Sequence, residues 1–186
     1  MAEVKILVKG YTSADSGPGE EKTCSTISLV KSGNIIMVCD PGVLADQKIL
    51  VDALKKEGLN ISDINYVFIT HSHIDHYRNI GMFANAKTLE YFGIWNGNIC
   101  ENWHENFTDD IKIIKTPGHN YDALTLLVNT KDGVVAICGD VFWKENEPEK
   151  DPYASDLNRL SESRKKILQM ADWIVPGHAD IYKVKK

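Results

Sequence analysis

A run of residue types that commonly bind metals stands at 71–76, where the sequence reads HSHIDH. Side chains alternate along extended backbone, so His71 and His73 point to the same side and can hold one cation. Asp75 and His76 fall where a helix is expected to begin, and this turns them toward a neighbouring position. Four ligand-type residues within six positions can therefore serve two adjacent metal ions.

Two of the other histidines also stand directly after strand-like runs. His119, in TPGHN, comes directly after the strand-like run IKIIKT, and His178, in VPGH, directly after DWIV. Both lie in strand-end loops, where functional residues concentrate. Asp140 ends an apolar strand, where an unpaired carboxylate is unfavourable unless a cation offsets its burial. Only His104 is left outside these motifs, so the pattern predicts a metal site built from several strand ends.

The elements needed to position these residues are expected in two halves, each with strands first and a helix later. Each sheet has one face to bury and each helix has one apolar stripe, so two sheets packed face to face with helices outside would bury them all. Residues 11–23 are expected to form a mobile loop. The predicted strands are 4–8, 26–30, 34–39, 66–70, 111–115, 124–129, 134–138 and 173–175, and the predicted helices are 43–57 and 157–171.

Length and composition exclude several classes of protein. The chain has 186 residues and a net charge of −5, which predicts one domain over 1–186 and disfavours binding of nucleic acid through charge alone. It has no run of about 18 apolar residues to span a membrane, and its N-terminus lacks the order of a signal peptide. Its four cysteines form no CxxC pair, so neither a disulfide framework nor a thiolate zinc site is expected. We therefore expect a cytoplasmic protein with no membrane association and no predictable oligomeric state.

The HSHIDH run, followed by Gly118-His119, Gly139-Asp140 and Gly177-His178, resembles the signature of the metallo-β-lactamase fold superfamily. The resemblance extends over nearly the whole chain and implies an α/β (α+β) fold, the four-layer αββα sandwich. The stretch from Gly139 to His178 also resembles the group of small members around metallo-β-lactamase domain-containing protein 1.

The resemblance implies a site with two metal ions and assigns a role to each residue. By the family pattern, one metal is bound by His71, His73 and His119, and the other by Asp75, His76 and His178, with Asp140 bridging both. Asp40 resembles a family turn residue beneath the metals and is expected to accept a hydrogen bond from a ligand histidine or a backbone amide. The alternative is a helix N-terminal cap or an ordinary turn residue before Val43.

Imidazole nitrogen and carboxylate oxygen suit Zn²⁺, and also Fe and Mn, so two Zn²⁺ ions are expected without excluding the others. Metals about 3.5–4 Å apart can hold a bridging hydroxide that attacks a carbonyl carbon or phosphorus. Asp75 and Asp140 are the expected catalytic residues, with Asp75 orienting the hydroxide. The resemblance thus implies a metal-dependent hydrolase of a small ester, thioester, lactone or phosphodiester. Zinc β-lactamases of the common type have a cysteine where Asp140 stands, which argues against antibiotic hydrolysis.

Two alternatives stay open. The first is a compact single-domain nuclease, for which Arg159, Arg164, Lys165 and Lys166 could form a basic helix face. The second is a mononuclear iron persulfide dioxygenase, whose ligand pattern matches His71, His119 and Asp140. Tyr77, Asn120, Tyr121 and Trp143 adjoin the candidate ligands and are candidates for a substrate pocket. The sequence does not identify the substrate.

Overall fold

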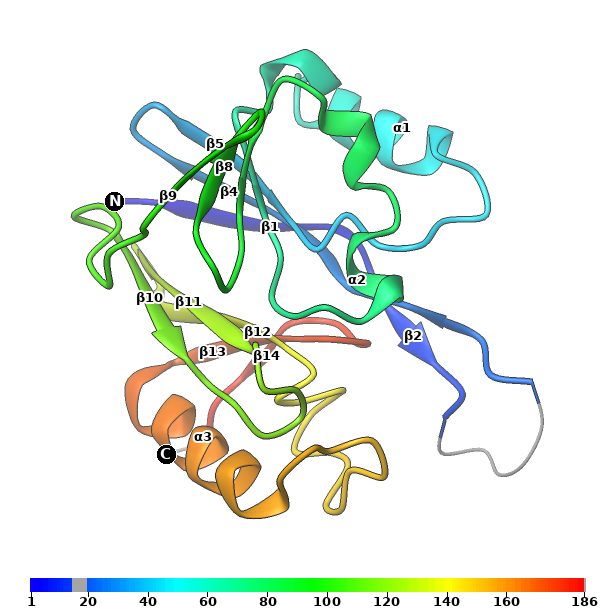
Figure 1. Cartoon of the computed structure of the whole chain (residues 1–186), viewed down its shortest axis with the longest axis vertical. Coiled ribbons are helices and arrows are strands. Elements are labelled where there is room, and N and C mark those ends of the chain that lie inside the picture. The colour runs from blue at the N-terminus through cyan, green and yellow to red at the C-terminus, as the bar shows by residue number, and fades with distance from the viewer. Residues whose placement is uncertain (15–19, 186) are drawn as a thin grey trace.

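Two β-sheets face one another in the computed structural model, which describes residues 1–14 and 20–185 (Figure 1). The first sheet runs in the order β1 (Glu3–Val8), β4 (Ile27–Ser32), β5 (Ile35–Cys39), β6 (Tyr66–Phe68), β7 (Lys87–Leu89), β8 (Ile94–Asn96) and β9 (Ile99–Glu101). The second runs β10 (Ile111–Lys115), β11 (Leu124–Thr130), β12 (Gly133–Gly139), β13 (Trp173–Pro176) and β14 (Tyr182–Lys183). A separate hairpin pairs β2 (Tyr11–Thr12) with β3 (Thr23–Cys24).

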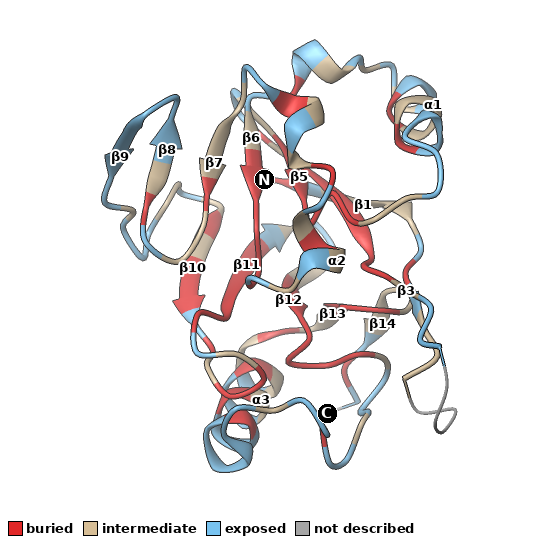
Figure 2. Cartoon of the chain, turned by 45° about the vertical axis from the view of Figure 1, so that its right-hand side comes forward, coloured by how far each residue is buried: buried red, intermediate tan, exposed pale blue. Residues whose placement is uncertain are grey.

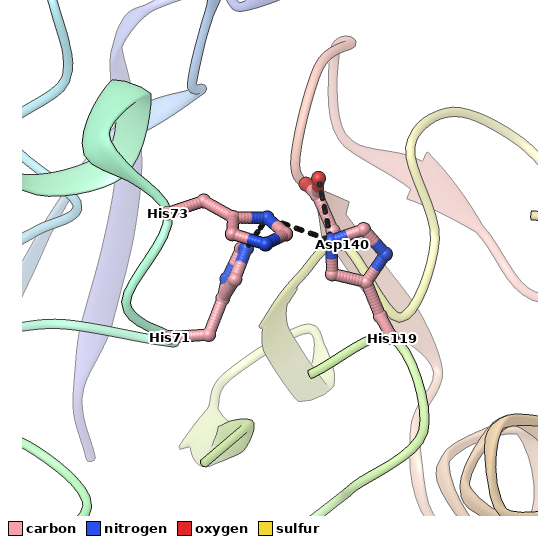
Figure 3. A group of neighbouring side chains, drawn as sticks. All are labelled: His71, His73, His119 and Asp140. Carbon is pink, nitrogen blue, oxygen red and sulfur yellow. Dashed lines mark hydrogen bonds and ion pairs between the residues drawn. The ribbon is translucent and has the colours of Figure 1, made fainter. Parts of the chain in front are cut away.

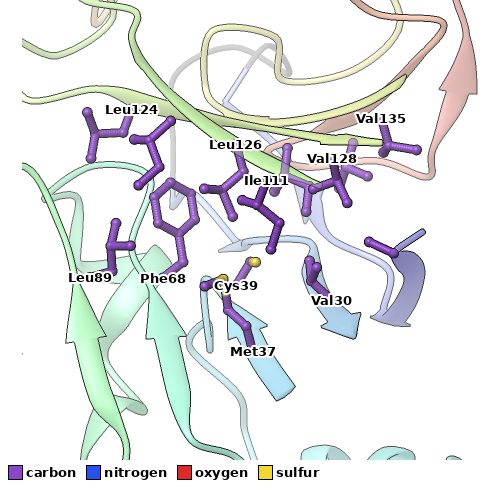
Figure 4. Packing of buried hydrophobic residues seen from close by; sticks show 14 residues of the cluster. Val30, Met37, Cys39, Phe68, Leu89, Ile111, Leu124, Leu126, Val128 and Val135 are labelled. Carbon is purple, nitrogen blue, oxygen red and sulfur yellow. The ribbon is translucent and has the colours of Figure 1, made fainter. Parts of the chain in front are cut away.

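The core between the sheets follows from the two-residue repeat of the strands. In β5 and β6, Met37 and Phe68 point into the central cluster, whereas Val38 and Val67 point to the outer face of the same sheet. Leu124 and Leu126 of β11 meet the central residues from the opposite sheet (Figure 4). Because both sheets bury one face here, their relative position is fixed by apolar packing.

Helices cover the outer faces. Leu50 and Leu54 of α1 (Lys48–Lys56) pack on the first sheet, and Leu160 and Ile167 of α3 (Leu157–Met170) pack on the second. A short helix, α2 (Ile74–Tyr77), follows β6. Figure 2 shows buried strands at the centre with exposed helical faces outside. The predicted four-layer αββα arrangement is therefore confirmed.

Several predicted boundaries are wrong. The first helix begins at Lys48 and not at residue 43, because Gly42 bonds with its N–H to the carbonyl of His76 and with its carbonyl to the N–H of Asn79. These bonds hold the chain against α2 until Asp46 accepts the N–H of Lys48 and the helix starts. Strands β7, β8, β9 and β14 were not predicted, since two or three residues cannot display an alternating pattern.

The expected loop at 11–23 is only partly described. Its ends form the β2–β3 hairpin, and residues 15–19 lie outside the described residues, so the expectation of mobility is not tested. Within the described part of the chain, no helix has the length and apolar character needed to cross a bilayer.

Candidate metal centre

The seven predicted ligands come together where strands of both sheets end. His71 and His73 follow β6, His119 follows β10, Asp140 follows β12 and His178 follows β13. Their ligand atoms form two groups, within each of which all atoms lie within 4.8 Å of one another. The first group is His71, His73, His119 and Asp140, and the second is Asp75, His76 and His178. His104, exposed and remote in sequence, belongs to neither group.

The first group converges on one point from three loops (Figure 3). Nδ1 of His73 lies 3.0 Å from Nε2 of His71 and 3.0 Å from Nε2 of His119. Nε2 of His119 is 3.4 Å from Oδ2 of Asp140. Ligand atoms placed tetrahedrally around zinc at 2.0–2.1 Å are roughly 3.3 Å apart, so these separations suit a shared cation.

Asp140 connects the two groups. Its Oδ1 lies 3.2 Å from Nε2 of His76 and 3.1 Å from Nε2 of His178, while Oδ2 faces His119. Asp75 closes the second group, with Oδ2 3.6 Å from Nε2 of His178. Oδ2 is also 3.2 Å from Nε2 of His178, so this single carboxylate faces histidines of both groups.

In three of the candidate ligand histidines, the ring nitrogen that does not face the site is hydrogen-bonded to a protein acceptor. Nδ1 of His76 donates to Oδ2 of Asp40 at 2.8 Å, and Nδ1 of His178 donates to the carbonyl of Cys24 at 3.0 Å. Nδ1 of His119 donates to Oδ2 of Asp151. In each case Nδ1 is taken up by a protein acceptor, so Nε2 is the nitrogen that faces the cluster and is available to a metal.

Asp40 has the expected supporting role. Besides His76, its carboxylate accepts the backbone N–H of Thr70 at 2.8 Å and the Thr70 hydroxyl at 2.7 Å. Asp40 has a positive φ of 48°, a left-handed conformation that Asp tolerates better than most residues. The alternative, a helix cap, is wrong, because α1 begins eight residues later.

Burial and mutual charge set the protonation of the cluster. Burial lowers the pKa of His71 well below its ordinary value, and neighbouring His76 adds to the effect. Burial also disfavours the charged form of His76, but Asp140 and Asp40 outweigh it and raise the pKa of His76 well above the ordinary value. Burial opposes ionisation of Asp140, yet His178 and His76 hold the pKa of Asp140 well below its usual range. Asp140 is therefore a buried anion balanced by its histidine neighbours.

Two buried atoms at the centre indicate that the residues fit a cation. Nε2 of His76 and Oδ1 of Asp140 have no hydrogen-bond partner, although both are buried and lie 3.2 Å apart. Buried polar atoms in proteins are normally paired, so unpaired atoms at this point are explained by coordination. The donor set of imidazoles and carboxylates suits a divalent transition metal.

Two supporting residues were not predicted. Asp151 lies in the acidic stretch 145–151, where nothing in the sequence distinguishes it from Glu145, Glu147 and Glu149. Thr23 donates its hydroxyl to Oδ2 of Asp75 at 2.8 Å, a contact made through the β2–β3 hairpin that no sequence pattern marks.

Of the four residues predicted to line a substrate pocket, two line pockets and two make contacts within the protein. Tyr77 lines a pocket of about 180 Å³ beside His71, and Tyr121 lines another of about 390 Å³. Asn120 donates to Ser72 at 3.3 Å, whereas Trp143 is buried and stacks on Tyr153. A further pocket of about 640 Å³ lies among β1, residues 130–132 and Trp173 and contains none of the seven candidate ligands.

The predicted basic helix face is partly wrong. Arg164 is drawn into the fold, where Nε donates to the carbonyl of Val141 and Nη1 to that of Pro148, each at 2.7 Å. Its guanidinium lies over the ring of Phe142. Arg164 is therefore a packing residue, and Arg159, Lys165 and Lys166 remain exposed.

Comparisons with known proteins agree with this geometry. A family model named metallo-beta-lactamase superfamily matches residues 25–96. Metallo-beta-lactamase domain-containing protein 1 of Xenopus laevis is 28% identical over 98% of this chain and 82% of its own length. A "probable metallo-hydrolase" of Methanocaldococcus jannaschii is 31% identical over 98% of this chain and 90% of its own.

Solved structures share the fold. A Thermotoga maritima protein whose name assigns it to the metallo-beta-lactamases superposes with a TM-score of 0.78 at 25% identity, covering 98% of this chain and 99% of that one. An N-acyl homoserine lactone hydrolase, with product bound at its catalytic metal centre, superposes with a TM-score of 0.70 at 16% identity, covering 95% and 92%. Because the sequence similarity runs along nearly the full length of both chains and includes the HSHIDH run, this chain belongs to the metallo-beta-lactamase superfamily of metal-dependent hydrolases.

Proposed function

We propose that the protein is a dinuclear zinc hydrolase that cleaves a small ester, thioester or lactone. The observation that carries this proposal is the position of Asp140, whose two oxygens face histidines of both ligand groups at 3.1–3.4 Å. One metal would be held by His71, His73 and His119, and the other by Asp75, His76 and His178, with Asp140 contacting both. Zinc is our choice because the separations of 3.0–3.4 Å in the first group suit donors placed tetrahedrally around zinc.

Divalent cations bound in such a site supply a hydroxide nucleophile at neutral pH and polarise the electrophilic oxygen. The chain's own part is to fix the donors. Asp40 and Asp151 orient His76 and His119, and Thr23 holds the Asp75 carboxylate near the second group. The nearby thiols do not compete as nucleophiles, because burial raises the pKa of both Cys24 and Cys138.

Attack on a carbonyl carbon is supported by the neighbour that hydrolyses N-acyl homoserine lactone. The persulfide dioxygenase alternative uses His71, His119 and Asp140 alone. That family shares the HxHxDH signature, so the position of His73 does not distinguish it from the hydrolase, and the identity and number of bound metals do. The nuclease alternative loses Arg164 from its basic face.

The compartment is also a proposal. The four cysteines form no disulfide, as expected of a protein in a reducing compartment, and we place the protein in the cytoplasm on this basis.

The test is a substrate panel with zinc-loaded protein: a thioester, a lactone, an RNA phosphodiester and a persulfide. His73→Ala should reduce hydrolysis of the best ester substrate by more than about 100-fold, since it removes a donor of the first group. His104→Ala is the matched control, because His104 is an exposed histidine outside both groups. Oxygen consumption on the persulfide by an iron-loaded sample, or cleavage of RNA alone, would overturn the ester-hydrolase proposal.

A further inference from the structure

A second pocket adjoins the candidate metal centre and has the opposite charge to the protein as a whole. It has a volume of about 390 Å³ and lies between the end of β10, the loop around His119 and α3. Its lining includes Tyr91, Lys115, Tyr121, Arg159, Glu162 and Lys166. With three cations and one carboxylate it carries a charge of +2, in a chain whose net charge is −5.

The pocket is connected to the metal centre by the chain itself. Pro117 and Tyr121 each stand two residues from His119, and Ser163 donates to the carbonyl of Pro117 at 2.7 Å. Tyr91 lines this pocket and also the pocket of about 180 Å³ that contains His71 and Ser72. The two pockets therefore share a wall at Tyr91.

The cations are available and partly preorganised. Nζ of Lys115 lies 4.5 Å from the centre of the Tyr91 ring and 5.8 Å from that of Trp103, so aromatic faces hold it in place without neutralising it. The carboxylate nearest to Arg159 is that of Asp156, at 3.9 Å, which is a weak contact between exposed groups. Lys166 is exposed on α3.

We propose that this basic pocket binds a phosphate group of the substrate, so that the hydrolase acts on an ester carrying a phosphate monoester away from the bond it cleaves. This inference rests on the hydrolase function proposed above. A phosphate monoester carries a charge close to −2 at neutral pH, which matches the +2 of the pocket, and a carboxylate carries half of that. Arginine with lysine is the usual cationic set for phosphate, and the tyrosines pack on the apolar part of the substrate.

The kinetic test compares three 4-nitrophenyl esters of equal chain length, ending in a methyl group, a carboxylate or a phosphate. The measured quantity is the ratio of kcat/KM for each charged ester to that of the uncharged one. Lys166→Gln should reduce the phosphate ratio about tenfold or more, since it removes a charged partner. Lys165→Gln is the matched control, because it removes the same charge from the adjacent exposed position outside the pocket.

Equal ratios for Lys166→Gln and Lys165→Gln would overturn the proposal, and so would a higher ratio for the carboxylate ester than for the phosphate ester. A second measurement needs no activity: titration of the zinc-loaded protein with inorganic phosphate, followed by backbone amide NMR shifts. Saturable shifts are expected at Lys115, Arg159 and Lys166, and they should be lost in Lys166→Gln. Shifts confined to the metal-binding loops would disprove phosphate binding in the pocket. Phosphate binding in the pocket without ester hydrolysis would disprove only the proposed hydrolase function.

Discussion

Nδ1 of His119 donates a hydrogen bond to Oδ2 of Asp151, which is buried at 4% exposure in the loop between β12 and α3, the loop that begins with the candidate ligand Asp140. A carboxylate can only accept, so this bond fixes the proton of His119 on Nδ1 and leaves Nε2 for a metal. The other oxygen of Asp151 accepts the N–H of Tyr153 at 2.9 Å, which holds the carboxylate in place.

Asp151→Ala should therefore weaken zinc binding about 10–100-fold, the usual effect of removing a partner of a ligand histidine. Asp151→Asn keeps a hydrogen-bond acceptor, so its zinc affinity should lie between that of Asp151→Ala and that of the unsubstituted protein. Zinc affinity measured by competition with a chromophoric chelator checks this. Glu149→Ala, an exposed carboxylate two residues away, is the control, and equal affinities for Asp151→Ala and Glu149→Ala would disprove the role.

Gly177 stands directly against the carboxylate of Asp140. A Cβ at this position would lie 1.8 Å from Oδ1 of Asp140 and 3.1 Å from the carbonyl carbon of Gly139. Gly177→Ala should displace Asp140, reduce zinc content below two equivalents and lower hydrolysis by more than about tenfold. Gly81→Ala has open space around its new Cβ and should change neither the zinc content nor the rate of hydrolysis. Full zinc content in Gly177→Ala would show that the carboxylate is not needed where the structure places it.

Metal removal should lower thermal stability, because zinc binds the folded cluster and only weakly the unfolded chain. At a free zinc concentration 100 times Kd, the stabilisation is about 2.7 kcal/mol, or roughly 5–10 °C in Tm for a chain of this length. Differential scanning calorimetry with zinc, with chelator, and after zinc is restored measures the change. His73→Ala should show a smaller zinc-dependent shift than His104→Ala; identical Tm values with zinc and with chelator would contradict the site.

Arg164 should be important for stability and not for substrate binding. It donates to the carbonyls of Val141 and Pro148 and covers Phe142, so Arg164→Ala should lower the free energy of unfolding by about 2–3 kcal/mol. Lys165→Ala, exposed on the same helix, should change it by less than about 0.5 kcal/mol. Urea unfolding followed by circular dichroism gives both values. Equal losses of unfolding free energy in the two variants would mean that the contacts of Arg164 with Val141 and Pro148 do not stabilise the protein.

The positions of the seven candidate ligands could be predicted because each follows a strong strand signal, and the ends of strands meet in a two-sheet fold. His119 and His178 each follow a Pro-Gly pair after an apolar run, a pattern readable without a structure. Two packed sheets with helices outside followed from two strand-rich halves that each include a helix, and the family resemblance implied the four-layer αββα sandwich. These features are local, and local patterns are what a sequence displays.

The partners of the ligands could not be predicted, because they depend on how loops cross. Asp151 reaches His119 only because Ser155 and Asp156 bond through their N–H groups to the carbonyls of His119 and Gly118. Arg164 fixes the same loop from the helix side. Long-range contacts of this kind leave no periodicity, and therefore the sequence did not distinguish Asp151 from its acidic neighbours.

The most direct test of the two-metal account is the metal content of the purified protein by inductively coupled plasma mass spectrometry. The protein should hold close to two equivalents of zinc, and His76→Ala, which removes a donor of the second group alone, should hold close to one. One equivalent of iron in the unsubstituted protein, or no bound metal after incubation with zinc, would contradict it.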